Sequence, residues 1–232
     1  MSDTETGSLS GIDLFSDMEP AELERVERAC SFKRYASQEQ IIDRQNDSQD
    51  VFFVVEGAVR VVIYSLSGRE ITLEDLAKGN HFGEMAAIDG APRSASVMAL
   101  DNCLIASLPQ EPFLGLFGTH PDIALKVMRM LTGVIRTSIN RIMDLSTLAA
   151  NNRVHADLLR LSRIHSKGDN TAAISPIPTH SDIASRASTT RETVARVFGD
   201  LTKIGIVERQ KKALMVLDVE QLSDMVEEVR GE

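Results

Sequence analysis

A long, uninterrupted helical pattern constrains this chain more than any other feature of its sequence. We expect Thr119 to cap the helix and Pro121 to lie in its first turn, where the missing proline N–H costs nothing. The pattern then runs without a further proline to about Leu148. At 1.5 Å per residue this predicts a helix of roughly 42 Å, which is longer than packing on one small domain requires.

Apolar side chains along this helix repeat at alternating intervals of three and four residues. The repeating positions are Met128, Leu131, Ile135, Ser138, Ile142, Leu145 and Ala149, of which Ser138 alone is polar. A heptad seam of this kind is typical of a helix that packs against another helix. We therefore expect a parallel homodimer with the first six of these residues at its interface. The alternative is a helix that packs only on its own domain.

The chain changes character on either side of this helix. Residues 10–35 have the apolar spacing of a helix. β-rich runs follow at residues 40–43, 51–55, 59–64, 71–75 and 97–108, separated by turn signals at Glu56-Gly57, Ser67-Gly68 and Lys78-Gly79. Short strands at this spacing predict an antiparallel roll or barrel. After the long helix, Asn151 and Asn152 can cap a new one. We expect an α+β fold with domains at residues 1–118, 119–150 and 151–232.

The charge of the chain is unevenly distributed. Its net charge is −9, and residues 1–152 account for all of that excess, with 13 basic and 22 acidic residues. Residues 153–232 hold 12 of each, and residues 179–212 hold 7 basic against 4 acidic residues. A local positive excess of this kind suits a polyanionic partner.

Composition excludes several classes of protein. The apolar runs fall far short of the ~20 residues of a membrane span, and residues 1–15 lack the basic and apolar regions of a secretory signal. Cys30 and Cys103 are the only cysteines, and they give no disulfide framework and no metal-ligand spacing. No nucleophile–base pair and no P-loop is visible. We expect a cytoplasmic protein that is not an enzyme, contacts no membrane and holds no metal.

The first candidate site lies in residues 79–97, GNHFGEMAAIDGAPRSASV. Gly83 lets a ligand approach the backbone closely, and the residues after it can form one helical turn whose free N–H groups point at an anion. Arg93 supplies a planar fork that suits a phosphate, and Ser94 adds a hydroxyl. Glu84 can accept a hydrogen bond from a sugar hydroxyl. The alternative is an ordinary turn at Gly83, with Glu84 and Arg93 on the surface.

The second candidate site lies in residues 179–212. Thr179 with Asp182, and Thr189 with Glu192, form two capping-box patterns, which predict two short helices joined by a tight turn. The buried stripe of the second helix is expected to be Val194, Val197, Leu201 and Ile204, and its opposite face carries Arg191, Glu192, Ala195 and Arg196. Arginine can pair with guanine, and glutamate can accept from cytosine. The alternative is a solvated charged face on an ordinary helical hairpin.

The remaining C-terminal residues predict a β-hairpin and a helix. Residues 206–218 can form a hairpin around Lys211 and Lys212, whose ammonium groups would meet phosphate. The acidic helix after it is expected to pack on its domain or to stay solvated.

The first site resembles the phosphate-binding cassette of cyclic-nucleotide-binding domains, including the spacing of nine residues from Glu84 to Arg93. With the roll, the long helix and the helical hairpin in this order, residues 12–218 resemble the CRP/FNR family of bacterial transcription regulators. The resemblance implies a set of ligand-binding residues: Gly83, Glu84, Met85, Ala86, Arg93, Ser94, Ala95, Ser138 and Ile139.

The resemblance also assigns roles to these ligand-binding residues. Gly83, Arg93 and Ser94 would hold the cyclic phosphate, and Glu84 would accept from the ribose 2′-OH. Ser138 falls where the family has a threonine that reaches the purine. Ile139 falls where the cyclic-AMP receptor has a serine that contacts the base in the partner subunit, and isoleucine cannot make that hydrogen bond. Cyclic AMP is the expected effector, with cyclic GMP, or both nucleotides, as the alternative.

The second site resembles the winged helix-turn-helix of the same family. The residues implied for DNA binding are Thr179, Thr189, Thr190, Arg191, Glu192, Arg196, Lys211 and Lys212. Arg191, Glu192 and Arg196 would read a half-site such as TGTGA in double-stranded DNA. Ser188 stands where many relatives have a glycine in the turn. The implied function is a homodimeric transcription regulator of a palindromic site, with RNA polymerase as a further partner.

Two other regulators of the same fold stay open. An iron–sulfur sensor needs an N-terminal cysteine cluster that this sequence lacks, and a heme sensor needs axial ligands, for which His81 is the only candidate. A regulator that works without any nucleotide is the second alternative, although the intact cassette argues against it.

Overall fold

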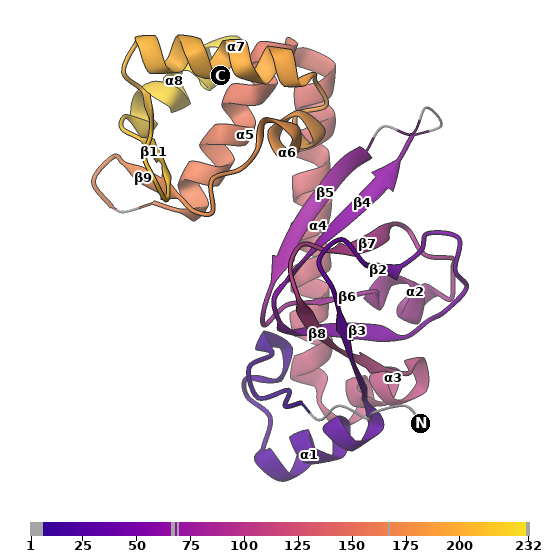
Figure 1. The fold of residues 1–232 in the computed structure, drawn as a ribbon. Coiled ribbons are helices and arrows are strands. Elements are labelled where there is room, and N and C mark those ends of the chain that lie inside the picture. Colours follow the sequence, from indigo (N-terminus) through magenta and orange to yellow (C-terminus); the bar gives the residue numbers. More distant parts are fainter. Residues whose placement is uncertain (1–6, 66–67, 69, 167, 231–232) are drawn as a thin grey trace. The chain divides into compact units, whose positions relative to one another are not determined.

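The computed structural model describes residues 7–65, 68, 70–166 and 168–230. Contacts divide the chain into two units, residues 1–133 and 134–232, and the division falls inside one long helix, α4 (Pro121–Thr147). Each unit has a hydrophobic core of its own, and no described helix is long and apolar enough to span a membrane. Figure 1 shows the elements of both units.

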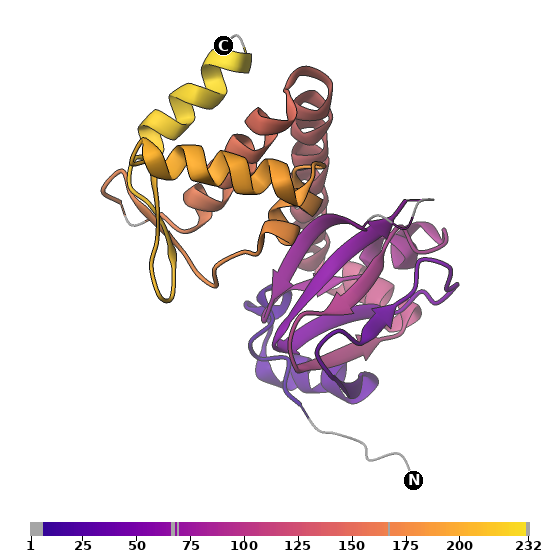
Figure 2. The ribbon, with the colours of Figure 1, turned by 45° about the horizontal axis from the view of Figure 1, so that its top comes forward.

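As far as its residues are described, the first unit is built from two four-stranded antiparallel sheets and the helices beside them. In chain order its elements are the 3-10 turn η1 (Asp13–Phe15), α1 (Pro20–Ala29), β1 (Ser31–Tyr35), β2 (Gln40–Ile42), β3 (Val51–Glu56), β4 (Ala58–Tyr64), β5 (Glu70–Ala77), β6 (His81–Phe82), α2 (Glu84–Asp89), β7 (Ser96–Ala99), β8 (Cys103–Leu108), α3 (Gln110–Thr119) and the first half of α4. The strand orders are β1-β8-β3-β6 and β2-β7-β4-β5, and Figure 2 shows the β-roll that they form. The predicted antiparallel roll is confirmed.

Strand β3 contributes to both cores of this unit. Its sequence, VFFVV, does not alternate between apolar and polar residues, and a run of this kind is typical of a strand that is buried on both faces. Phe53 packs in the cluster shared with η1, α1, α3 and α4. Phe52 and Val54 pack in the cluster between the two sheets. The strand therefore joins the outer helices to the interior of the roll.

The structure corrects three expectations about the first unit. The predicted helix at residues 10–35 is only η1 and α1, because Pro20 begins α1 and residues 31–35 pair with β8 as a strand. Helix α3 was not predicted, since its two glycines obscure the helical pattern. Thr119 does not cap α4: it is the last residue of α3, and its hydroxyl donates to the carbonyl of Gly115 at 3.3 Å. The turn predicted at Ser67 lies outside the described residues.

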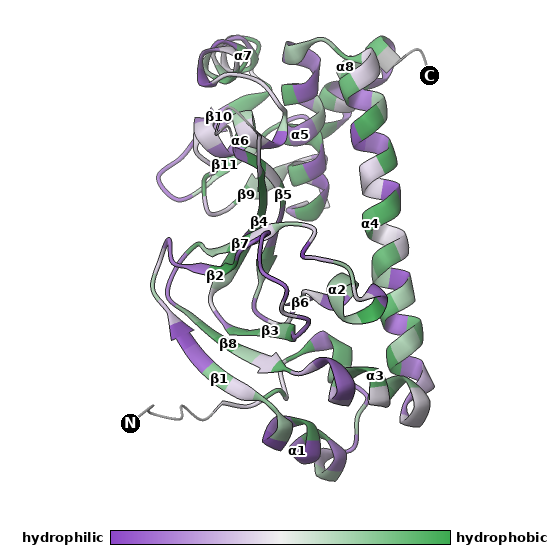
Figure 3. Ribbon diagram, turned by 90° about the vertical axis from the view of Figure 1, so that its right-hand side faces the viewer, coloured by the Kyte–Doolittle hydropathy of each residue, from purple (hydrophilic) through white to green (hydrophobic). Residues whose placement is uncertain are grey.

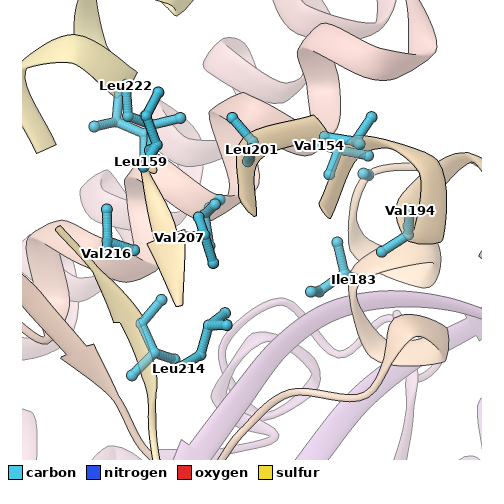
Figure 4. Packing of buried hydrophobic residues seen from close by; sticks show 14 of the residues in the cluster. Val154, Leu159, Ile183, Val194, Leu201, Val207, Leu214, Val216 and Leu222 are labelled. Atoms are coloured by element: carbon cyan, nitrogen blue, oxygen red, sulfur yellow. The ribbon is translucent and has the colours of Figure 1, made fainter. Parts of the chain in front are cut away.

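The described residues of the second unit form four complete helices and a three-stranded sheet. Its elements after α4 are α5 (Ala150–Ile164), β9 (Ala172–Ile174), α6 (His180–Arg186), α7 (Arg191–Lys203), β10 (Val207–Arg209), β11 (Leu214–Val216) and α8 (Val219–Arg230), and the strand order is β10-β11-β9. Figure 4 shows part of its core, in which side chains of α5, α6, α7 and α8 meet side chains of the sheet. Leu222 and Val226 are fully buried, so the acidic C-terminal helix packs on its domain as expected.

Two features of the second unit differ from the sequence analysis. Asn151 and Asn152 do not cap α5: the N-cap is Ala149, and both asparagines lie in the first turn of the helix. Strand β9 was not predicted, because only three residues in a polar loop form it. They pair with β11, whose other edge pairs with β10.

Helix α4 leaves most of the predicted seam uncovered. Met128, Ile135, Ile142 and Leu145 are 45–62% exposed, whereas Leu131 is half-buried against the core of the first unit. Figure 3 shows hydrophobic residues, in green, recurring along this helix. An exposed apolar stripe of this length on one helix is typical of an interaction surface.

Burial of His81 predicts that the β-roll loses stability in acid. Burial lowers the pKa of this imidazole to about 4 from its ordinary 6.5, although the nearby Asp13 carboxylate opposes that shift. Between these two pH values the unfolded chain binds a proton that the folded chain excludes, so stability falls as the pH falls from 6.5 toward 4. At pH 5 the loss relative to pH 7 is expected to be about 2 kcal/mol.

The measurement is the free energy of unfolding by urea at pH 7 and pH 5, for the native protein and for His81→Gln. The variant should lose markedly less stability between the two pH values than the native protein does. An equal loss in both proteins would contradict this role of His81.

Candidate functional site

Gly83 occupies the centre of the first site, between β6 and α2. Its φ of +88° and ψ of 0° place it in the left-handed region that favours glycine. A Cβ at this position would come within 2.7 Å of Arg93 Nη1 and 3.0 Å of the Asp50 carbonyl oxygen. Glycine is therefore required both by the backbone conformation and by the lack of space.

Arg93 is buried at this turn, with 4% of its surface exposed. Its Nη1 donates to the carbonyl oxygen of Gly83 at 2.9 Å, and its Nη2 donates to the carbonyl oxygen of Asp50 at 2.8 Å. Nη2 and Nε also donate to the hydroxyl of Ser48, at 3.0 and 3.3 Å. Its guanidinium carbon lies 5.4 Å from the centre of the Phe52 ring. The alternative of a surface arginine is wrong.

Glu84 is the second buried charge of this site, with 7% of its surface exposed. Burial raises the pKa of its carboxyl, whereas its own backbone N–H and the charge of Arg93 act in the opposite direction. Burial likewise lowers the pKa of Arg93. A buried acid and a buried guanidinium beside a glycine turn suit a ligand that carries hydroxyl groups and an anionic group.

Some of the other predicted ligand-binding residues are buried and others are exposed to solvent. Ala86 and Ala95 are buried, whereas Met85 and Ser94 are exposed and make a weak contact between the Ser94 hydroxyl and the Met85 sulfur at 3.8 Å. Ser138 and Ile139 lie on the part of α4 that belongs to the second unit, and both are exposed to solvent.

Ser48 and Asp50 are functional candidates that the sequence analysis missed. They hold the guanidinium of Arg93 from the loop between β2 and β3, 45 and 43 residues earlier in the chain. No local pattern could have found them, because one contributes a hydroxyl and the other a main-chain carbonyl. Among the described residues, no group of three His, Cys, Asp or Glu side chains is placed to hold a metal ion.

The helical hairpin of the second site is confirmed, with one change at a cap. Thr179 and Asp182 form a reciprocal capping box at the start of α6, with hydrogen bonds of 3.2 and 2.9 Å. The second cap is Thr190 instead of Thr189: its hydroxyl accepts from the Thr193 N–H at 3.2 Å. Thr189 lies one residue before this cap, and Ser188 before it adopts a left-handed φ of +49°.

Helix α7 presents a charged face to solvent and an apolar face to the core. Arg191, Glu192, Ala195 and Arg196 are all exposed, whereas Val194, Val197 and Leu201 are buried. Ile204 was expected in the buried stripe, but it is 55% exposed because α7 ends at Lys203.

The predicted wing is a short antiparallel hairpin of β10 and β11. Gln210 N–H donates to the Ala213 carbonyl oxygen at 3.0 Å, which closes the turn that carries Lys211 and Lys212. Both lysines are exposed. An exposed basic hairpin beside a helix with an exposed basic N-terminal end suits a double helix, since the hairpin can meet phosphates while the helix meets base edges.

Two models of known domains match the parts of the chain that hold the two candidate sites. A model of the cyclic nucleotide-binding domain matches residues 32–120, and a model of the Crp-like helix-turn-helix domain matches residues 152–225. The chain is 33% identical over 204 residues to the cyclic AMP receptor protein of Thermus thermophilus, covering 86% of this chain and 89% of that protein.

Two more distant relatives agree with these matches. The cAMP-activated global transcriptional regulator CRP of Pasteurella multocida is 24% identical over 188 residues, covering 81% of this chain and 90% of that protein. A solved structure of a CooA mutant from Carboxydothermus hydrogenoformans has a TM-score of 0.79 at 22% identity, covering 96% of this chain and 97% of that one. At that identity the structural likeness shows the fold.

Proposed function

The chain belongs to the CRP/FNR family of DNA-binding transcription regulators, which are not enzymes, and we propose that cyclic AMP activates it on a palindromic TGTGA-like site. The observation that carries this proposal is the pair of buried charges, Glu84 and Arg93, at a glycine turn with no room for a side chain. The pair matches the two polar groups of a cyclic nucleotide, its ribose hydroxyl and its cyclic phosphate. The names of the two sequence relatives support cyclic AMP as the first candidate.

The guanidinium of Arg93 binds the cyclic phosphate in this mechanism. Its bonds to the carbonyls of Gly83 and Asp50 fix its plane before the ligand arrives. The phosphate would take the place of the Ser48 hydroxyl on Nε and Nη2. The ribose 2′-OH donates to Glu84, and Ser94 and the Ala95 N–H complete the phosphate contacts.

Cyclic GMP is the second candidate effector, because Ile139 replaces the serine that contacts the base in the resemblance and so leaves the identity of the purine open. An isoleucine side chain has no hydrogen-bonding atom for adenine, and it is 54% exposed on α4. The hydroxyls of Ser94 and Ser138 could serve guanine as well as adenine. In a heme-binding or nucleotide-independent regulator, the buried charges of the cassette would have no ligand to bind.

The DNA-bound form is proposed to be a homodimer joined through the α4 seam. Each recognition helix α7 would lie in a major groove, about 34 Å from the other, with Arg191, Glu192 and Arg196 at the base edges. Thr179, Thr189, Thr190, Lys211 and Lys212 would contact phosphates. The nucleotide shifts the population toward the arrangement in which both helices fit the DNA. RNA polymerase is the proposed further partner, and the cytoplasm is where both would be met.

The direct test of the effector is a calorimetric titration with cyclic AMP and, separately, cyclic GMP, for the native protein and for Arg93→Met. Because the variant loses a charge-assisted bidentate contact, its affinity for the nucleotide should fall at least about 30-fold, which is ~2 kcal/mol. Arg44→Met, which removes an exposed arginine from the loop that holds Arg93, should bind as the native protein does.

The outcomes of this titration test both the identity of the effector and the role of Arg93. Binding of cyclic GMP alone would favour the second candidate, and binding of neither nucleotide would contradict the proposed function. Native affinity in a folded Arg93→Met would contradict the role of Arg93. An absorbance spectrum of the purified protein checks for heme.

Arg191→Ala tests sequence reading by α7. Because a bidentate arginine–guanine contact contributes about 1–3 kcal/mol of discrimination, the variant should bind a duplex with inverted TGTGA half-sites roughly 5- to 150-fold more weakly. Binding to a random duplex of equal length should change much less. Arg163→Ala, at an exposed arginine of α5, is the control. An equal loss on both duplexes would show that Arg191 contacts only phosphate.

Ile135→Asp tests the α4 seam. Ile135 is 59% exposed, and burial of a carboxylate in a helix–helix interface is costly. Light scattering should therefore report the dimer mass for the native protein and for Thr137→Asp, which lies off the seam, but the monomer mass for Ile135→Asp. A dimer of Ile135→Asp, or a native monomer, would exclude this seam as the interface.

A further inference from the structure

The turn that joins α6 to α7 offers three consecutive main-chain carbonyls to arginine side chains. The carbonyl oxygen of Arg186 accepts from Arg141 Nη2 at 3.0 Å. The next two, of Ala187 and Ser188, accept from Nε and Nη2 of Arg153 at 2.9 and 3.0 Å. Arg141 lies on α4 and Arg153 on α5, so side chains from two other helices hold this turn.

A buried ion pair anchors the first residue of this set to α5. Asp157 of α5 and Arg186 of α6 have side chains that are only 8% and 9% exposed. Nε of Arg186 lies 3.1 and 3.0 Å from the two carboxylate oxygens, and Arg160 Nη2 donates to the same carboxylate at 3.0 Å. Because a buried charge that loses its partner is costly, neither side chain can leave the other without a penalty.

Arg153 also connects this turn to the junction of α4 and α5. Its Nη1 donates to the carbonyl oxygen of Leu148 at 2.8 Å, within the two residues that separate the helices. The recognition helix α7 begins at Arg191, three residues after the left-handed Ser188. A displacement of the junction therefore acts on the turn before α7 through hydrogen bonds.

We propose that Arg141, Arg153, Asp157 and Arg186, here named the turn-binding cluster, set the orientation of α7 on α4 and so carry the nucleotide response to the DNA-reading face. The proposal rests on the proposed function. Arg141 follows Ser138, the proposed purine contact, by three residues, which is about one helical turn. A change of α4 at the nucleotide thus reaches the Arg186 carbonyl directly. All four are positioning residues that need touch neither nucleotide nor DNA.

The first arm of the test measures the coupling of nucleotide to DNA. The quantity is the ratio of dissociation constants for the TGTGA duplex without and with saturating cyclic AMP, or cyclic GMP if only that binds. Arg141→Met should lower this ratio at least fivefold, toward 1, while the calorimetric affinity for the nucleotide changes less than twofold. Arg136→Met, the same substitution at an exposed arginine of α4, should keep the native ratio. Arg141→Lys should retain part of it.

The second arm needs neither ligand nor DNA. The Ala187 and Thr189 N–H groups donate to the carbonyls of Ile183 and Ala184 at 2.8 and 2.9 Å, so their hydrogen exchange reports on the turn. Peptides that cover residues 184–190 should exchange at least fivefold faster in Arg141→Met than in Arg136→Met. Peptides from the core of α7 should exchange equally in both.

A double variant separates positioning from stability. Asp157→Leu combined with Arg186→Met removes the ion pair without leaving an unpaired buried charge, so its melting temperature should stay near the native value. Its coupling ratio should nevertheless fall as in Arg141→Met. A native ratio in these variants, or unchanged exchange of residues 184–190 in Arg141→Met, would overturn the proposal. A native protein whose DNA binding ignores both nucleotides would instead refute the proposed function, and the exchange arm would still decide whether the cluster holds the turn.

Discussion

Burial of the Arg93 guanidinium imposes a condition on every element around it, because each buried N–H must find an oxygen. The carbonyls of Gly83 and Asp50 and the hydroxyl of Ser48 meet that condition for four of its five N–H groups. To supply them, the chain needs a left-handed glycine after β6 and a loop before β3 that returns to the same point. The position of the β2–β3 loop and the absence of a side chain at residue 83 are thus consequences of one buried cation.

The overall fold could be predicted because its signals are local. The β-rich runs, the heptad spacing of α4 and the capping box of Thr179 with Asp182 each lie within a few residues of sequence, and each is present in the structure. Errors occurred where the local signal was ambiguous. Two adjacent threonines made the cap of α7 uncertain by one residue, and the glycines of α3 weakened its helical pattern.

The contacts that define both sites could not be predicted in the same way. Arg93 reaches residues 43 and 45 positions away, and Arg153 reaches carbonyls 34 and 35 positions away. Most of these acceptors are main-chain carbonyls, which every residue possesses, so no residue type marks them. The sequence identifies the arginine and its capacity for several hydrogen bonds, but only the folded chain identifies the acceptors.

The arginine contacts of the α6–α7 turn determine how far the DNA-reading hairpin can be separated from the rest of the protein. Ser188 has a left-handed backbone conformation, which is less favourable for serine than for glycine. Its carbonyl oxygen accepts a hydrogen bond from Arg153. A fragment that begins at residue 151 would keep Arg153 but lose Arg141 and the Leu148 carbonyl. Transplanting α6 and α7 alone would lose every one of these partners. The transferable module therefore begins inside α4, before Arg141, and a chimaera spliced at the α4–α5 junction would leave the Arg186 carbonyl without its Arg141 donor.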